Sequence, residues 1–207
     1  MRTELTLGAW FELREAWLGP ADAARLHEDL VRELRWEQRH IVLFGKQVLQ
    51  PRLIAWAGQL PYRYSGQTLE PRPWPAPLAT LLEQLQARVS RASGAAFNHV
   101  LVNRYRDGKD SMGYHADAEP ELGLDPVVST LSLGQTRRFL LRPQRLLRPQ
   151  GRAKGERALA LQLETGSLLV MGGTCQRHYR HALAREESAP LGERLSLTFR
   201  RLLKAPG

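Results

Sequence analysis

The chain has 207 residues, which fits one domain or one domain with an added lobe. Hydrophobic residues make up 43% of it, enough for a packed core and too many for a disordered chain. No run is long enough to span a membrane, no signal-peptide pattern opens the chain, and the single cysteine, Cys175, excludes an internal disulfide framework. We therefore expect a cytoplasmic monomer without membrane partners.

The charge balance indicates an acidic partner. Thirty Lys and Arg against 21 Asp and Glu give a net charge of +9, and nearly all the cations are arginine. Guanidinium groups bind phosphate in a bidentate manner, so this balance favours nucleic acid. An arginine-biased genome would give the same composition without such a role. Residues 142–157 form an arginine-rich segment, predicted to be a loop that is either solvated or in contact with nucleic acid.

Two amphipathic helices are predicted in the first half of the chain, over 19–34 and 76–93. The stretch between them, 44–75, is rich in turn residues and aromatics, which favours short strands and loops. The second half instead predicts strands at 98–105, 127–134, 137–142, 158–165, 167–172 and 194–202. Helices followed by antiparallel strands predict an α+β fold with a β-sandwich or barrel core.

The segment "GYHADAEPELG" contains a candidate half of a metal site. His115 and Asp117 lie two residues apart, where a strand would run out into a loop. Two imidazoles and one carboxylate form the facial triad of non-haem Fe(II) oxygenases, so a third ligand is needed, and His178 and His181 are both candidates. By itself, an H-x-D pair occurs often by chance.

The alternation in the last predicted strand, 194–202, indicates a candidate anion site. Its polar residues share one face and its apolar residues the other: Arg194, Ser196, Thr198 and Arg200 against Leu195, Leu197 and Phe199. If the apolar face packs on the helices, both arginines point into the sandwich, where they need anions such as a small dicarboxylate. A solvated edge strand would show the same alternation. Asn103 and Tyr105 also share a face, which indicates a polar lumen.

Taken in order, "NRYRDGKDSMGYHADAEPEL", "VVSTLSLGQTRRFLLR", "GSLLVMGG", "HYRHAL" and "RLSLTFR" resemble the AlkB family of Fe(II)- and 2-oxoglutarate-dependent dioxygenases, over roughly residues 40 to 202. The resemblance implies a single domain, 1–207. Its core would be a double-stranded β-helix (jelly roll) over 96–203, preceded by N-terminal helices and a nucleotide-recognition lid over 1–95.

The resemblance also implies the cofactors and their residues. His115, Asp117 and His181 would hold Fe(II), and 2-oxoglutarate and O₂ would fill the open positions. The co-substrate residues would be Asn103, Tyr105, Arg194, Thr198 and Arg200. Arg200 would pair with the far carboxylate of 2-oxoglutarate, and Arg194 would lie at the metal-chelating carboxylate or brace Asp117.

The lid implied by the resemblance would hold a base flipped out of the stack. Phe44 would fill the vacated space, Tyr62 and Tyr64 in "YRYSG" would contact the base together with Ser65, and Glu119 would meet its exocyclic nitrogen. Lys46 and Arg52 would touch phosphate. Without the resemblance, simple core packing explains Phe44 and Tyr64 equally well.

Two positions depart from the family pattern: Ser196 replaces an asparagine, and Glu186 and Glu187 stand where duplex-preferring relatives have a basic run. The implied activity is oxidative demethylation of 1-methyladenine and 3-methylcytosine in DNA, with decarboxylation of 2-oxoglutarate to succinate and release of formaldehyde. The alternatives are an RNA demethylase of the same class, a non-catalytic nucleic-acid-binding module, and a small-molecule or protein hydroxylase on this fold.

Overall fold

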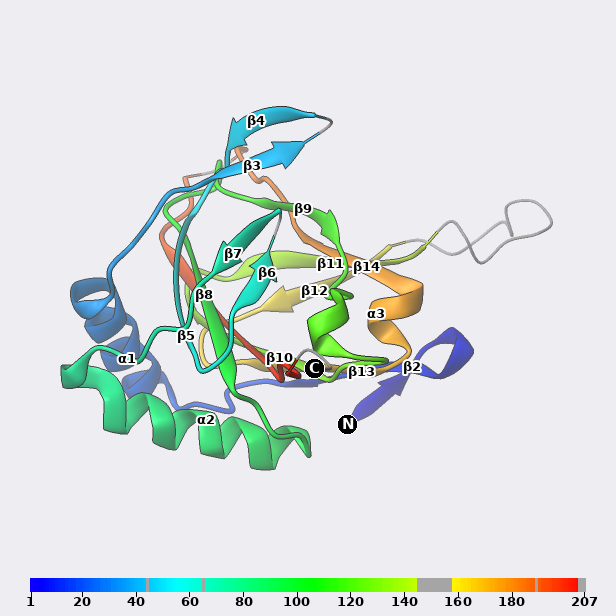
Figure 1. The fold of residues 1–207 in the computed structure, drawn as a ribbon, viewed down its shortest axis with the longest axis horizontal. Helices are drawn as coiled ribbons and strands as arrows, with labels where there is room; N and C mark the ends of the chain where they lie inside the picture. Colours follow the sequence, from blue (N-terminus) through cyan, green and yellow to red (C-terminus); the bar gives the residue numbers. More distant parts are fainter. Residues whose placement is uncertain (44, 65, 145–157, 189, 205–207) are drawn as a thin grey trace.

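The computed structural model describes residues 1–43, 45–64, 66–144, 158–188 and 190–204 (Figure 1). Within these residues, the larger of two antiparallel sheets has seven strands, in the order β1 (Arg2–Glu4), β2 (Ala9–Arg14), β13 (Leu168–Gly173), β10 (Val128–Gly134), β15 (Arg194–Arg200), β8 (His99–Tyr105) and β5 (Leu53–Gly58). The smaller sheet has the order β12 (Leu159–Leu163), β11 (Arg137–Pro143), β14 (Tyr179–Leu183) and β9 (Met112–His115). Phe11 and Met171 of the larger sheet pack against Phe139 and Leu163 of the smaller one. The two sheets form a jelly-roll core.

Two helices, α1 (Pro20–Glu33) and α2 (Ala79–Ser93), cover the outer face of the larger sheet (Figure 1). Leu30 and Leu82 from the helices share one apolar cluster with Leu195, Leu197 and Phe199 of β15. The apolar face of the last strand therefore packs outward against helices, which is one of the two arrangements that its alternation left open. The other helical segments are α3 (Cys175–His178) and the short 3₁₀ turns Thr6–Gly8, Ala76–Leu78 and Pro120–Leu122.

Two hairpins lie outside the core sheets: β3 (His40–Leu43) with β4 (Lys46–Leu49), and β6 (Tyr62–Tyr64) with β7 (Gln67–Leu69). In each hairpin the second strand directly follows a glycine at positive φ, Gly45 at 75° and Gly66 at 79°. Figure 1 shows β3–β4 standing at the top of the molecule.

The predicted helices and the six predicted strands are all present, but five described strands fall outside the predicted ranges. These are β1, β2, β3, β9 and β14, which are short or of mixed polarity. Because β1, β2 and β5 belong to the larger sheet, the first 95 residues contribute to the core as well as to helices and hairpins, which differs from the expected division at residue 95. No helix in the described part of the chain is long and apolar enough to cross a membrane.

Candidate metal centre

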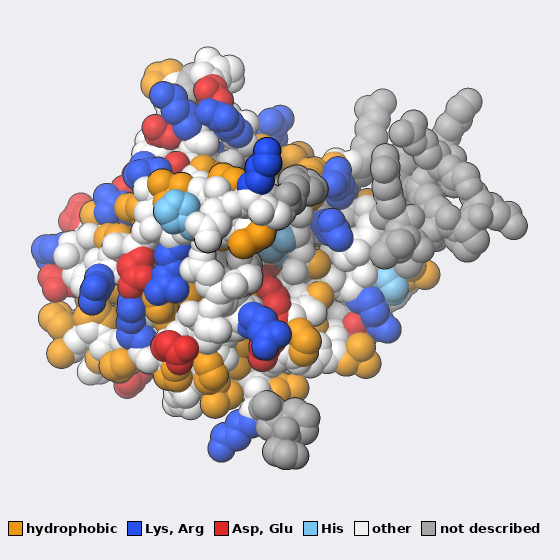
Figure 2. All heavy atoms as spheres, turned by 45° about the horizontal axis from the view of Figure 1, so that its top comes forward, with side chains coloured by type: hydrophobic (Ala, Val, Ile, Leu, Met, Phe, Trp, Pro, Cys, Tyr) orange, Lys and Arg blue, Asp and Glu red, His pale blue; other side chains and the backbone are white. Residues whose placement is uncertain are grey.

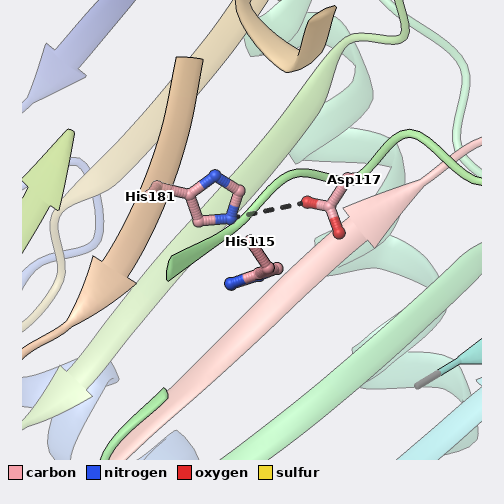
Figure 3. A group of neighbouring side chains, drawn as sticks. All are labelled: His115, Asp117 and His181. Atoms are coloured by element: carbon pink, nitrogen blue, oxygen red, sulfur yellow. Dashed lines mark ion pairs between the residues drawn. The ribbon is translucent and has the colours of Figure 1, made fainter. Parts of the chain in front are cut away.

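Three side chains from two neighbouring segments converge between the sheets (Figure 3). His115 ends β9, Asp117 follows two residues later, and His181 pairs directly with His115 across β9 and β14. One ligand atom from each of the three lies within 4.8 Å of the others. His181 Nε2 is 3.8 Å from Asp117 Oδ2, and the two imidazole ring centroids are 4.2 Å apart. The structure thus brings His181 to the H-x-D pair, while half-buried His178 ends α3 outside this group.

Hydrogen bonds from neighbouring residues orient two of these side chains. His115 Nδ1 lies 2.9 Å from the carbonyl oxygen of Gly113, which makes Nδ1 the donor and leaves the Nε2 lone pair available. Asp117 Oδ1 accepts hydrogen bonds from Arg200 Nε (3.1 Å) and Nη2 (2.6 Å). Asp117 Oδ2 is buried and has no hydrogen-bond partner among the described residues.

Burial and charge set the protonation of the three groups. Burial lowers the pKa of His181 to about 3, and it also lowers the pKa of His115. Burial opposes the charge of Asp117, but Arg200 and the two histidines outweigh it and hold the pKa of that carboxyl below its usual value. Two neutral imidazoles and one carboxylate are therefore present at neutral pH, as a divalent iron site requires.

A cavity extends from His115 and His181 along the inner face of β15. Its lining also includes Asn103, Tyr105, Met112, Thr130, Phe139, Leu183, Arg194, Ser196, Thr198 and Arg200. Phe139 stacks on His181 with ring centroids 5.4 Å apart, so it shapes the wall next to the two histidines. The lining is polar along β15, whereas the smaller sheet contributes the two histidines together with the apolar side chains of Met112, Phe139 and Leu183.

The two arginines of β15 line this cavity six residues apart, and Arg200 rather than Arg194 braces Asp117. Arg200 pairs with Asp117, and Arg194 donates from Nη2 to Ser132 Oγ (2.8 Å) with its guanidinium 5.5 Å from the Tyr105 ring. Six residues along a strand span roughly 20 Å. Arg200 therefore braces the metal carboxylate, and Arg194 stands at the far end, where Nε of this buried guanidinium has no partner among the described residues.

Arg52 was predicted to contact phosphate, and its position contradicts this. The side chain is 3% exposed, and it donates from Nε to Asn103 Oδ1 (2.9 Å) and from Nη1 to the carbonyl oxygen of Ser111 (3.3 Å). A charge held inside the protein by buried acceptors does not reach a surface phosphate. Because Asn103 Oδ1 accepts from Arg52, the Nδ2 amino group is the part of the amide left for the cavity.

Tyr62 was predicted to contact or stack on a flipped base, and it is instead fully buried. Its ring packs edge-on against His99 at 4.9 Å and lies 5.5 Å from the Arg200 guanidinium. Glu119 is half-buried beside Tyr62, and burial together with Asp117 raises the pKa of its carboxyl. Lys46 is exposed on β4.

Several other predictions fall on parts of the chain outside those the structure describes. They concern Phe44, Ser65, the side chain of Tyr64, and residues 145–157 of the basic segment.

The sequence analysis missed several residues of the site, among them Ser132, Phe139 and Gln176. Gln176 is 1% exposed and accepts the backbone N–H of Asp117 at Oε1 (3.0 Å). Alternation along 137–142 could have indicated that Phe139 faces inward. Nothing in the sequence marks Ser132 or Gln176, since each reaches the site through long-range packing.

Known proteins are similar to this chain in sequence and in fold. The family model described as the 2OG-Fe(II) oxygenase superfamily matches residues 11–200. Alpha-ketoglutarate-dependent dioxygenase alkB homolog 3 of Bos taurus is 35% identical over 185 residues, which cover 89% of this chain and 63% of that protein. DNA oxidative demethylase ALKBH2 of Mus musculus is 36% identical over 190 residues, covering 89% of this chain and 77% of that protein.

The chain spans less than two thirds of the length of the alkB homolog 3 proteins that it matches. Among solved structures, that of OsALKBH1 superposes with a TM-score of 0.59 at 19% identity, covering 97% of this chain and 100% of the other. At this level of identity, the likeness shows a shared fold.

Proposed function

The chain belongs to the AlkB family within the 2OG-Fe(II) oxygenase superfamily, and from this premise we propose that it demethylates N-alkylated bases of DNA, such as 1-methyladenine and 3-methylcytosine. The observation that carries the proposal is the convergence of His115, Asp117 and His181 beside a cavity whose lining also includes the buried Arg194. Iron bound there with 2-oxoglutarate and O₂ supplies the oxidation, which yields succinate, CO₂ and formaldehyde with the unmodified base.

The donor atoms of the three side chains fit Fe(II). Asp117 Oδ2 is a buried carboxylate oxygen without a partner among the described residues, while Arg200 occupies Oδ1. Asp117 can therefore bind a metal through one oxygen and remain neutralised through the other. The Gly113 carbonyl keeps the Nε2 lone pair of His115 free for coordination. This arrangement disfavours a purely non-catalytic binding module.

We assign Arg194 to the far carboxylate of 2-oxoglutarate. Its guanidinium is 1% exposed, and burial lowers the pKa of Arg194 to about 10, so the group remains charged at neutral pH. A buried cation whose Nε lacks a partner is suited to a dicarboxylate. Thr198 and the Nδ2 group of Asn103 offer donors along the cavity, and Tyr105 packs beside Arg194.

The substrate would enter from the face that carries the hairpins (Figure 2). Lys and Arg side chains are prominent over the upper half of this face, which suits a phosphate backbone. Lys46 is our candidate phosphate contact, and Phe44, Tyr64 and Ser65 are candidates for the base and its flanks. Glu119 would accept or share a hydrogen bond with the exocyclic nitrogen of the base.

The test is turnover of a 1-methyladenine oligonucleotide with Fe(II), 2-oxoglutarate and ascorbate, offered as single-stranded DNA, duplex DNA and RNA. We expect loss of one methyl mass with the wild type and with Asp29→Ala, a surface variant on α1, and no loss with Asp117→Ala. If succinate forms but none of the three oligonucleotides loses a methyl group, nucleobases are not the substrate. Faster turnover of RNA than of either DNA would assign RNA as the substrate. The duplex arm also tests the effect of Glu186 and Glu187 on strand preference.

We further propose that the protein acts as a monomer in a reducing compartment such as the cytoplasm. The single cysteine, Cys175, is buried and unpaired, which suits that compartment. Light scattering at assay concentration would test the monomer, and a mass twice that of the chain would contradict it.

A further inference from the structure

One carboxylate joins two arginines at the roots of the two hairpins. Glu37 Oε2 accepts from Arg39 Nε (2.9 Å), and Glu37 Oε1 accepts from Arg72 Nη2 (2.9 Å). Both guanidinium groups lie over the ring of Trp56, at 4.7 Å for Arg39 and 3.9 Å for Arg72. Trp56 is 3% exposed in the middle of β5. We call these four residues the Glu37 clamp.

Backbone hydrogen bonds tie Arg39 to the base of β3–β4, and tie Glu37 and Arg72 to β5, the strand that contains Trp56. The carbonyl oxygen of Arg39 accepts from Gln50 N (3.0 Å), which closes the base of β3–β4. Arg72 follows β7 and exchanges two backbone hydrogen bonds with Gly58, of 2.9 and 3.0 Å. Glu37 exchanges two with Ile54. The clamp therefore spans both hairpin roots and the edge strand between them.

Two further contacts reach the β6–β7 hairpin. Arg39, directly before β3, donates from Nη1 to Gln67 Oε1 on β7 (3.4 Å). Trp56 of β5 donates from Nε1 to the carbonyl oxygen of Glu70, directly after β7 (2.8 Å). β3–β4 and β6–β7 belong to separate two-stranded sheets, so no backbone ladder joins one hairpin to the other among the described residues.

Glu37 is the member whose charge holds the cluster together. The two guanidinium groups over one indole ring repel each other unless an anion lies between them. Glu37 is 20% exposed and the arginines are 30% and 33% exposed, so water screens the pairs only in part. Neutral glutamine at this position keeps the shape but removes the counter-charge of both arginines.

We propose that Glu37 is a positioning residue that couples the two hairpins, so that they meet nucleic acid as one unit. This inference rests on the proposed function, because it takes the hairpins to be the nucleic-acid contact. It predicts that loss of the Glu37 charge loosens both hairpins together and weakens binding of the oligonucleotide while leaving the metal and 2-oxoglutarate sites unchanged.

The test compares Glu37→Gln with Glu12→Gln. Glu12 also accepts two hydrogen bonds from an arginine, Arg14, and is 24% exposed, but it lies on β2. For Glu37→Gln we expect faster hydrogen exchange in both hairpins and a roughly tenfold rise in KM and Kd for a methylated oligonucleotide, equivalent to about 1.4 kcal/mol. The kcat and the KM for 2-oxoglutarate should not change. Glu37→Asp should recover part of the loss, and Glu12→Gln should match the wild type.

Three results would overturn the inference: exchange that rises in one hairpin only, exchange that rises throughout the chain, or an unchanged KM for the oligonucleotide in an active variant. Hydrogen exchange needs no substrate, so it reports on the clamp even if the wild type shows no turnover. In that case the proposed function fails, and hydrogen exchange in Glu37→Gln alone decides whether the two hairpins are coupled.

Discussion

Replacing Arg200 by methionine tests the assignment of the two arginines directly. Both Arg200 and Asp117 are 2% exposed at the side chain, and two hydrogen bonds join them. Methionine keeps most of the volume and removes the charge. The Asp117 carboxylate then has no counter-charge from the protein, so the variant should bind divalent metal less tightly and unfold more easily when metal-free.

The size of the effect follows from burial. Removing one partner of a buried ion pair costs about 3–5 kcal/mol, because the remaining charge is left uncompensated. Replacing a residue that orients a metal ligand lowers affinity by roughly 10- to 100-fold. Arg194 lies roughly 20 Å along the same strand and has no contact with Asp117. Its loss should leave metal affinity unchanged.

The assay is titration with Mn(II), a redox-stable substitute for Fe(II), followed by calorimetry under argon, together with urea unfolding of the metal-free proteins. Arg200→Met should bind Mn(II) roughly 10- to 100-fold more weakly than wild type. Arg200→Lys should fall between the two, because an ammonium keeps the charge but loses the fork. Equal Mn(II) affinity in Arg200→Met and wild type, or a loss confined to Arg194→Gln, would refute the assigned roles.

Three further predictions concern the co-substrate, the metal and pH. Arg194→Gln should raise the KM for 2-oxoglutarate by roughly 10- to 100-fold, because one or two charge-assisted hydrogen bonds are lost. An unchanged KM in an assay of succinate formation would show that Arg194 does not bind the far carboxylate of 2-oxoglutarate. Mn(II) at 100 times its Kd should stabilise the wild type by about 2.7 kcal/mol and raise its Tm by roughly 5–10 °C, whereas the Tm of Asp117→Ala should not change. If Mn(II) raises the Tm of both proteins equally in a thermal scan, the metal does not bind at Asp117. Burial and Arg200 lower the pKa of His99 from 6.5 to about 3, so the unfolded chain binds the extra proton and stability falls as pH drops below 6.5. In His99→Leu, the free energy of unfolding should fall less steeply between pH 6 and 4, by up to about 1.4 kcal/mol per pH unit. The measurement is urea unfolding of both proteins at a series of pH values. If the free energies of unfolding of the two proteins change with pH in the same way, His99 has no part in the loss.

Strong periodicity in the sequence was enough to predict the main helices and strands and the residue types of the site. The period-two alternation of β15 placed Arg194 and Arg200 on one face and its apolar residues on the other, because a strand places alternate side chains on opposite faces. It left open whether the arginines point inward or into solvent, and the structure has them buried, with the apolar face on α1 and α2. The H-x-D spacing indicated a metal pair, and the resemblance selected His181 over His178, which agrees with the pairing of His181 and His115 across β9 and β14.

Contacts between segments distant in the chain became known only from the folded structure. Alternation shows that Arg194 and Arg200 share a face, but which of them reaches Asp117 depends on how β15 pairs with β8 and on where the loop after β9 turns, and both are long-range properties. Burial of Arg52 and Tyr62 likewise depends on packing between segments distant in the chain. In the Glu37 clamp, the Glu37–Arg39 bond is local, but the contacts with Arg72 and Trp56 join separate segments and form only once the sheet is assembled, so no local pattern encodes them.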